Sequence, residues 1–246
     1  RKRVDLLHSY LADERARIEN LRIVGVTREE TPEVYDTFME YTTKAYASVK
    51  SPLELSFIPI HPGDILSYGG YHFEVKLLRG HTFGQCGLYE PEKKLMFVGD
   101  QLMTTIVPIV GTQETDLGML KCYLNSLGDL KHNYKDCYFL PCHYGEIKNV
   151  EKEVNRIILG YLEKCEIMKH VLEEAGTALT TRDIGVRTYG RSQGPPDYAH
   201  FASCTQIWAK TFSCMEYMMG EGFVERSERD GIIYWKAPSI HFENNR

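Results

Sequence analysis

The segment Leu78-Arg79-Gly80-His81-Thr82-Phe83-Gly84 places a histidine directly after an apolar strand, inside a turn flanked by glycines. Glycine lets the backbone approach another group closely. A second apolar strand, 95–98, ends in Gly99-Asp100, and a third, 137–140, ends in Pro141-Cys142-His143-Tyr144-Gly145. Each strand end therefore presents one potential metal ligand. Imidazole and carboxylate suit Zn²⁺ and other divalent first-row ions, and a carboxylate can bridge two ions whereas an imidazole cannot.

In this order, the three motifs resemble the later metal motifs of the metallo-β-lactamase-fold hydrolases. Residues 116–118 and 123–127 resemble the helix that precedes the last metal histidine in the branch with a C-terminal winged-helix module. The resemblance covers nearly the whole chain. It implies an α/β fold, the αββα sandwich of that family, followed by a small helical winged-helix domain.

The resemblance also implies a role for each ligand. His81 corresponds to the third histidine of the first metal site, Asp100 to the bridging carboxylate and His143 to the last ligand of the second site. The complete site would hold two zinc ions, and iron or manganese would suit the same donors.

The family's H-x-H-x-D-H motif, which supplies the other ligands, is not in these 246 residues. We therefore expect an N-terminally incomplete chain that lacks the first half of the sandwich, with the missing segment of the same protein as a partner. Each ion would have only two ligands from this chain, where zinc sites usually have three or four, so the chain alone should bind metal poorly.

The activity implied by the resemblance is metal-dependent hydrolysis. A metal-bound hydroxide, positioned with the help of Asp100, would attack an ester, thioester, lactone or similar small or acyl substrate. Asp100 is thus also the candidate catalytic residue, and Tyr144 is a candidate for substrate contact. Two alternatives stay open: a nuclease of the same fold, and a non-catalytic binding or assembly module without a complete metal site.

Composition argues against several other classes of function. The chain is 43% hydrophobic and 26% charged, and its 29 Lys and Arg against 34 Asp and Glu give a net charge of -5. No bulk positive field therefore exists to recruit nucleic acid or anionic membrane. The lack of a long apolar run or a signal segment predicts a cytoplasmic protein. The seven cysteines are odd in number and have no C-x-x-C spacing, which indicates reduced thiols rather than a disulfide framework.

Hydrophobic periodicity predicts the helices and strands, and the resemblance implies two domains. Residues 1–149 are interpreted as the C-terminal portion of a metallo-β-lactamase-like domain, and 150–246 as a linker helix plus a winged-helix-like domain. The predicted helices cover 6–24, 32–49, 116–131 and 150–175, the last ending at Gly176, and the predicted strands cover 55–60, 65–68, 72–78, 86–89, 94–98 and 137–140.

The pattern of the C-terminal region predicts a helix, a second helix and a hairpin. Residues 180–183 should cap a short helix, 205–219 should form another, and 223–236 should form a hairpin that turns at 229–231. Residues 177–246 contain eight Lys or Arg and eight Asp or Glu, which argues against DNA recognition. The apolar helix 205–219 instead predicts a homodimer contact or a wall of the substrate pocket. Phe201 and the loop 190–196 are predicted to form a lid.

Overall fold

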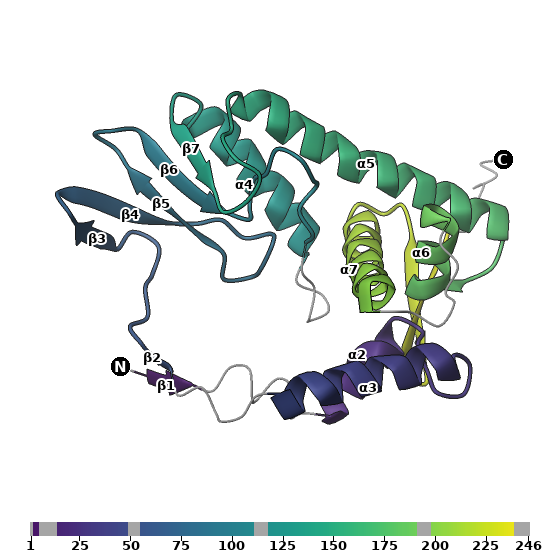
Figure 1. Cartoon of the computed structure of the whole chain (residues 1–246). Coiled ribbons are helices and arrows are strands. Elements are labelled where there is room, and N and C mark those ends of the chain that lie inside the picture. The colour runs from purple at the N-terminus through teal and green to yellow at the C-terminus, as the bar shows by residue number, and fades with distance from the viewer. Residues whose placement is uncertain (1, 5–13, 49–54, 111–117, 191–197, 239–246) are drawn as a thin grey trace, which may run out of the picture. The chain divides into compact units, whose positions relative to one another are not determined.

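The computed structural model describes residues 2–4, 14–48, 55–110, 118–190 and 198–238 (Figure 1). They form two compact units. The first comprises Arg1–Asp13 and Lys44–Glu163, and the second comprises Glu14–Thr43 and Lys164–Arg246. The division differs from the predicted boundary at residue 150, because it falls inside a continuous helix and assigns 14–43 to the second unit. An unbroken helix carries no local sequence signal of such a division.

The first unit is built on a five-stranded sheet, with the order β3-β4-β5-β6-β7. All neighbours are antiparallel except β6 and β7, which are parallel. Parallel neighbours need a crossover connection, and helix α4 provides it. The strands and helix are β3 (Ile65–Tyr68), β4 (Tyr71–Leu77), β5 (Cys86–Glu90), β6 (Leu95–Gly99), α4 (Met119–Asn133) and β7 (Tyr138–Pro141).

The predicted strands and helices of this unit are confirmed, with most boundaries shifted by one to three residues. The strand predicted over 55–60 is shorter, because β2 covers Leu55–Phe57 and pairs with β1 (Lys2–Val4). Of the helix predicted over 6–24, residues 6–13 lie outside the described part of the chain, and α2 covers Glu14–Ile23.

One face of the sheet forms the core of the first unit with α4. Met96, Val98 and Phe139 are buried on this face, and the α4 side chains Tyr123 and Leu127 are also fully buried. The alternation of buried and exposed residues along β6 follows the two-residue period of a strand. At β6, β7 and α4 this side of the sheet is thereby a closed apolar layer, whereas at β4 the same side carries the ion pair of Glu74 and Lys76.

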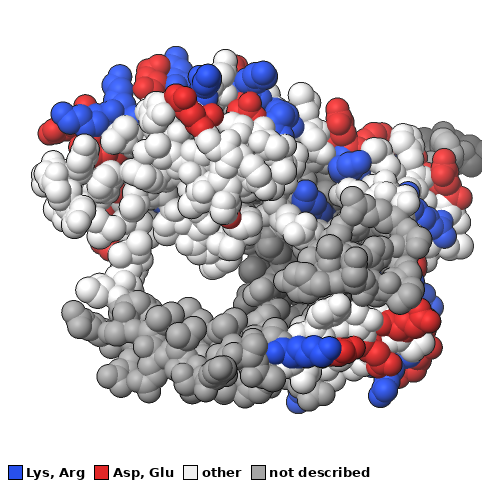
Figure 2. Space-filling model, viewed as in Figure 1, with Lys and Arg blue, Asp and Glu red and all other residues white. Residues whose placement is uncertain are grey.

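The opposite face of the sheet is apolar but exposed, and we call it the outer sheet face. Paired residues lie on the same face, and Phe73 stacks edge-on against Phe97 across β5. Figure 2 shows few charged side chains over these strands. The outer sheet face includes the exposed Tyr68, Tyr71, Leu77, Phe97 and Tyr138, the partly buried Leu66, Phe73, Leu88 and Leu140, and the buried Val75. Exposed apolar surface of this extent is typical of an interaction site.

Helix α5 (Val150–Ala175) has its first part in the first unit and its last part in the second. Its predicted bounds are confirmed. Gly176 follows it with φ 62° and donates its N–H to the carbonyl of Leu172, as the predicted left-handed end of the helix requires.

The second unit combines helices with a three-stranded sheet of order β8-β10-β9. The predicted cap is confirmed, because Thr180 accepts a hydrogen bond from the N–H of Asp183. The hairpin is also confirmed, with positive φ at Asp230 and Gly231 in its turn. The elements are α2, α3 (Pro32–Ser48), β8 (Leu179–Thr180), α6 (Thr181–Tyr189), α7 (Tyr198–Gly220), β9 (Glu225–Arg229) and β10 (Ile232–Lys236).

Helix α7 begins seven residues before the predicted start at 205. Its first turns contain Ala199 and Ala202, which favour helix without adding to an apolar pattern. The predicted lid cannot be followed here, since residues 191–196 and the side chain of Phe201 lie outside the described part of the structure. Among the described residues, no helix combines the length and apolar character needed to cross a membrane.

Candidate metal centre

The topology of the sheet brings the three predicted ligands to one edge. β4 and β6 run in the same direction, because each is antiparallel to β5 between them, and β7 is parallel to β6. The carboxyl ends of these strands therefore meet at the same edge. His81 lies in the loop after β4, Asp100 directly follows β6, and His143 follows β7.

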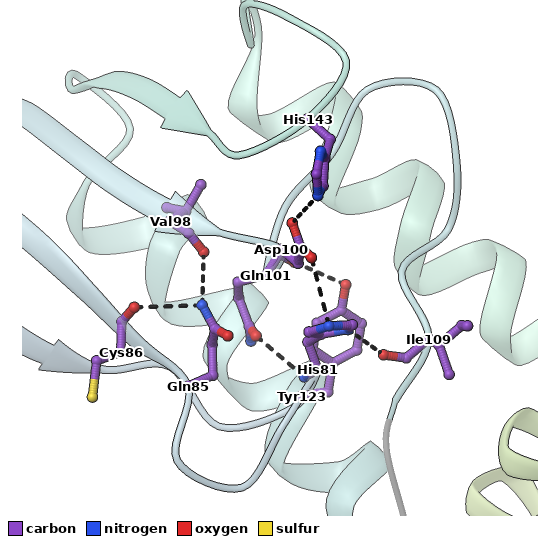
Figure 3. A network of polar contacts seen from close by, with 9 residues as sticks. All are labelled: His81, Gln85, Cys86, Val98, Asp100, Gln101, Ile109, Tyr123 and His143. Carbon is purple, nitrogen blue, oxygen red and sulfur yellow. Dashed lines mark hydrogen bonds and ion pairs between the residues drawn. The ribbon is translucent and has the colours of Figure 1, made fainter. Parts of the chain in front are cut away.

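The carboxylate of Asp100 lies between the two imidazoles (Figure 3). Nε2 of His81 is 3.7 Å from Oδ2, and Nε2 of His143 is 3.5 Å from Oδ1. Two ligands at about 2.1 Å from one zinc ion and at a tetrahedral angle would be about 3.4 Å apart. Each imidazole and its carboxylate oxygen thus have nearly the separation of two ligands of one ion, with Asp100 common to both pairs.

The hydrogen bonding of His81 determines whether the ring nitrogen that faces Asp100 carries a proton or a lone pair. Nδ1 is 2.8 Å from the carbonyl oxygen of Ile109. A carbonyl oxygen only accepts, so Nδ1 carries the proton and Nε2 of the neutral ring is unprotonated. A lone pair of Nε2 directed at a carboxylate is unfavourable unless a cation lies between them or the ring is itself protonated. A histidine fixed in this way by its other nitrogen is typical of a metal ligand.

Asp100 has an unsatisfied oxygen at this position. Its Oδ1 is buried and accepts no hydrogen bond from the described residues. A buried carboxylate oxygen that accepts no hydrogen bond is costly, and a metal ion would compensate that cost. The donor set of two imidazole nitrogens and a carboxylate therefore fits a zinc, iron or manganese ion.

The three residues do not form a preassembled metal site. Within the described ranges, no group of three or more His, Cys, Asp or Glu side chains is arranged to hold an ion. The side chain of His143 is 60% exposed, against 28% for His81 and 26% for Asp100. The structure thus contains two imidazole–carboxylate pairs that share one carboxylate.

Two other residues of the last loop lie on the surface. Tyr144, the predicted substrate contact, is 54% exposed, and its ring centroid is 6.0 Å from that of His143. Its backbone has φ 66°, and its carbonyl accepts a hydrogen bond from Thr104. Cys142 is an exposed free thiol.

Sequence reasoning missed the residues that support this edge. Gln101 is fully buried, and its side chain accepts a hydrogen bond from the N–H of His81 (Figure 3). The same side chain donates to the carbonyl of Arg79 and to Ser126 on α4. The hydroxyl of Tyr123 donates to the carbonyl of Gln101. Burial raises the pKa of Tyr123, so this hydroxyl keeps its proton. The position of Gln101 next to Asp100 was the available signal.

Comparison with solved structures shows the metallo-β-lactamase fold. The chain is similar to a metallo-beta-lactamase family protein from Thermus thermophilus, with a TM-score of 0.70 and 19% identity, covering 94% of this chain and 68% of that one. It is also similar to a beta-lactamase domain protein from Burkholderia ambifaria, with a TM-score of 0.74 and 18% identity, covering 91% of this chain and 62% of that one.

A curated sequence gives a short local match. Hydroxyacylglutathione hydrolase GloC from Haemophilus influenzae is 50% identical over 40 residues, which are 16% of this chain and 19% of that protein. The match thus spans about a fifth of the curated relative. No family model matches the chain.

Proposed function

We propose that this protein is a metal-dependent hydrolase of the metallo-β-lactamase fold, with His81, Asp100 and His143 as metal ligands. The observation that carries the proposal is the buried, unsatisfied Oδ1 of Asp100 in a carboxylate with an imidazole beside each oxygen. Zinc is the proposed metal, two ions in the complete site, and iron or manganese would suit the same donors.

Bound zinc supplies Lewis-acid chemistry, because it lowers the pKa of water towards neutrality and polarises the oxygen of an acyl group. The residues of the chain hold the donors in place for this chemistry. Nδ1 of His81 keeps its proton and donates it in a hydrogen bond to the carbonyl of Ile109, which leaves Nε2 free to ligate a metal ion. Asp100 presents one oxygen towards each histidine, so it can serve both metal positions. Tyr144 is placed beside His143 and is proposed to contact substrate.

The proposed substrate is an ester, thioester, lactone or similar small acyl compound. The local match to a hydroxyacylglutathione hydrolase favours an acyl substrate over RNA. The net charge of -5 argues in the same direction, since a nuclease would need a positive groove.

The remaining ligands are proposed to come from a histidine-containing segment outside these 246 residues. The outer sheet face supports this, because exposed aromatic side chains such as Tyr68 and Phe97 need a cover. A second sheet packs about 10 Å above such a face. This chain covers 68% and 62% of the lengths of the two similar solved structures, so each of them contains a further segment.

We also propose that the second unit is a winged-helix module that packs against protein rather than nucleic acid. Its support is the combination of α6, α7 and the sheet β8-β10-β9, together with the balance of charges over 177–246. A homodimer is the proposed assembly. The seven cysteines are free thiols, which favours the proposed cytoplasmic location.

The test is a calorimetric titration of the chain and of Asp100→Asn with zinc. The variant should bind zinc at least about tenfold more weakly, because it loses the carboxylate shared by both positions. Asp129→Asn, which removes the same charge from the exposed surface of α4, is the matched control and should bind as the unmodified chain does. Equal zinc affinity in all three proteins would contradict the proposal and favour the non-catalytic module.

A further inference from the structure

The loop between β6 and α4 carries the carbonyl that orients His81. Residues 100–110, the described part of this loop, contain no helix or strand. Ile109 lies in it, 28 residues beyond His81 in the sequence. A carbonyl in irregular chain orients an imidazole only if other contacts fix the loop, because the ordering entropy is otherwise unopposed.

Helix α5 supplies the contact on both sides of Ile109. The N–H of Val110 donates to the hydroxyl oxygen of Tyr161 at 3.0 Å. The same hydroxyl donates to the carbonyl of Pro108 at 2.6 Å. Tyr161 is 2% exposed, so neither bond competes with bulk water. A single hydroxyl thus holds the residue before and the residue after Ile109.

Two other residues of α5 reinforce the contact with this loop. The guanidinium of Arg156 donates to the carbonyls of Met103 and Ile106. A Cβ built on Gly160 would lie 3.3 Å from the side chain of Val107, so the backbone of the helix comes close to the loop. The loop is therefore attached to α5 at several points, and the attachment nearest to Ile109 is Tyr161.

We propose that Tyr161 is a positioning residue for His81. It acts through Ile109. The Tyr161 hydroxyl fixes the position of the Ile109 carbonyl, and this carbonyl keeps the proton of His81 on Nδ1. The unprotonated Nε2 then faces Asp100 with a lone pair that is available to a metal ion. The inference rests on the proposed function for its consequence, metal binding, but the hydrogen-bond chain itself does not depend on a metal. The aromatic ring has a separate role, because it packs edge-on against Tyr123 at 5.9 Å.

Tyr161→Phe tests the proposal, since it keeps the ring and removes only the hydroxyl. The matched control is Thr181→Ala in the second unit, which removes the acceptor of a buried bond from Trp235. Two measurements are made on each protein: the ¹⁵N chemical shifts of the neutral His81 ring, which report the protonated nitrogen, and the affinity for added zinc. Thermal unfolding shows that each variant is folded.

In Tyr161→Phe we expect part of the His81 population to move its proton from Nδ1 to Nε2, and zinc affinity to fall roughly tenfold. Thr181→Ala should change neither, although its thermal stability falls. A folded Tyr161→Phe with unchanged ¹⁵N shifts and unchanged zinc affinity would overturn the assignment. If the shifts change but the unmodified chain and Tyr161→Phe bind zinc with the same affinity, the positioning role stands and the proposed role of His81 as a metal ligand fails.

Discussion

Replacing Gly80 by alanine should destabilise the first unit more than the same replacement at Gly84, the other glycine of the loop that carries His81. Gly80 has φ 157° and is buried against α4. A Cβ at this position would lie 2.1 Å from Cδ2 of Tyr123 and 2.7 Å from its Cβ and Cγ. Tyr123 is itself fully buried and is held by its hydroxyl on the carbonyl of Gln101.

The expected cost follows from these contacts. Overpacking of a closed core costs about 1–3 kcal/mol. Rotation of Tyr123 away from the new methyl group would break its hydrogen bond, at about 1 kcal/mol. The free energy of unfolding of the first unit should therefore fall by roughly 3 kcal/mol. Gly84→Ala is the matched control in the same loop, because nothing lies within 4 Å of its built Cβ. Its effect should stay within about 0.5 kcal/mol.

The assay must report on the first unit alone. Both tryptophans, Trp208 and Trp235, belong to the second unit, so their fluorescence does not serve. Native-state hydrogen exchange of the β5 and β6 amides measures the free energy of opening where the first unit is buried. Protection in Gly80→Ala equal to that in Gly84→Ala would refute the close packing of the His81 loop against Tyr123.

Two further predictions concern the second unit. A hydrogen bond with Cys165 and burial raise the pKa of Cys214. The contribution of the Cys214 thiol to stability is therefore complete below about pH 8.5, the pKa of the thiol in the unfolded chain. As the pH rises above that value, the contribution is lost by up to about 1.4 kcal/mol per pH unit. Cys214→Ala should flatten this slope in unfolding followed by tryptophan fluorescence, and an unchanged slope would contradict the assignment. Gly231→Ala should cost about 1–2 kcal/mol, because Gly231 has φ 73° and its built Cβ meets Arg22 at 3.0 Å. Gly220→Ala is the control, because nothing lies within 4 Å of its built Cβ, and it should not destabilise the protein. Equal urea midpoints of unfolding for Gly231→Ala and Gly220→Ala would exclude the predicted strain at Gly231.

The elements could be predicted wherever a short segment carries its own signal. The predicted bounds of the strand 65–68 and the helix 150–175 agree with the observed ones, because turn residues and Gly176 mark their ends. The division into two units could not be predicted, since it lies inside α5 and depends on tertiary packing of 14–43. Local periodicity does not record which surface a helix packs against.

The site shows the same difference between local and distant information. His81 and Asp100 could be predicted as residues of one site, because their motifs and the order of these motifs resemble those of a known family, and their side chains lie 3.7 Å apart. The contacts of Ile109 and Tyr161 could not be predicted. They join segments 28 and 51 residues apart in the sequence, and one of them uses a main-chain carbonyl, which any residue type can provide.

The two proposed metal positions differ in how far this chain prepares them. On one side, His81 is held by the carbonyl of Ile109 and by the bond from its own N–H to Gln101. On the other side, His143 is 60% exposed and precedes the left-handed backbone of Tyr144. Ordering a ligand that is already held costs less conformational entropy than ordering an exposed one. The position between His81 and Asp100 should therefore bind zinc first, and the position at His143 should depend more strongly on ligands from outside the chain.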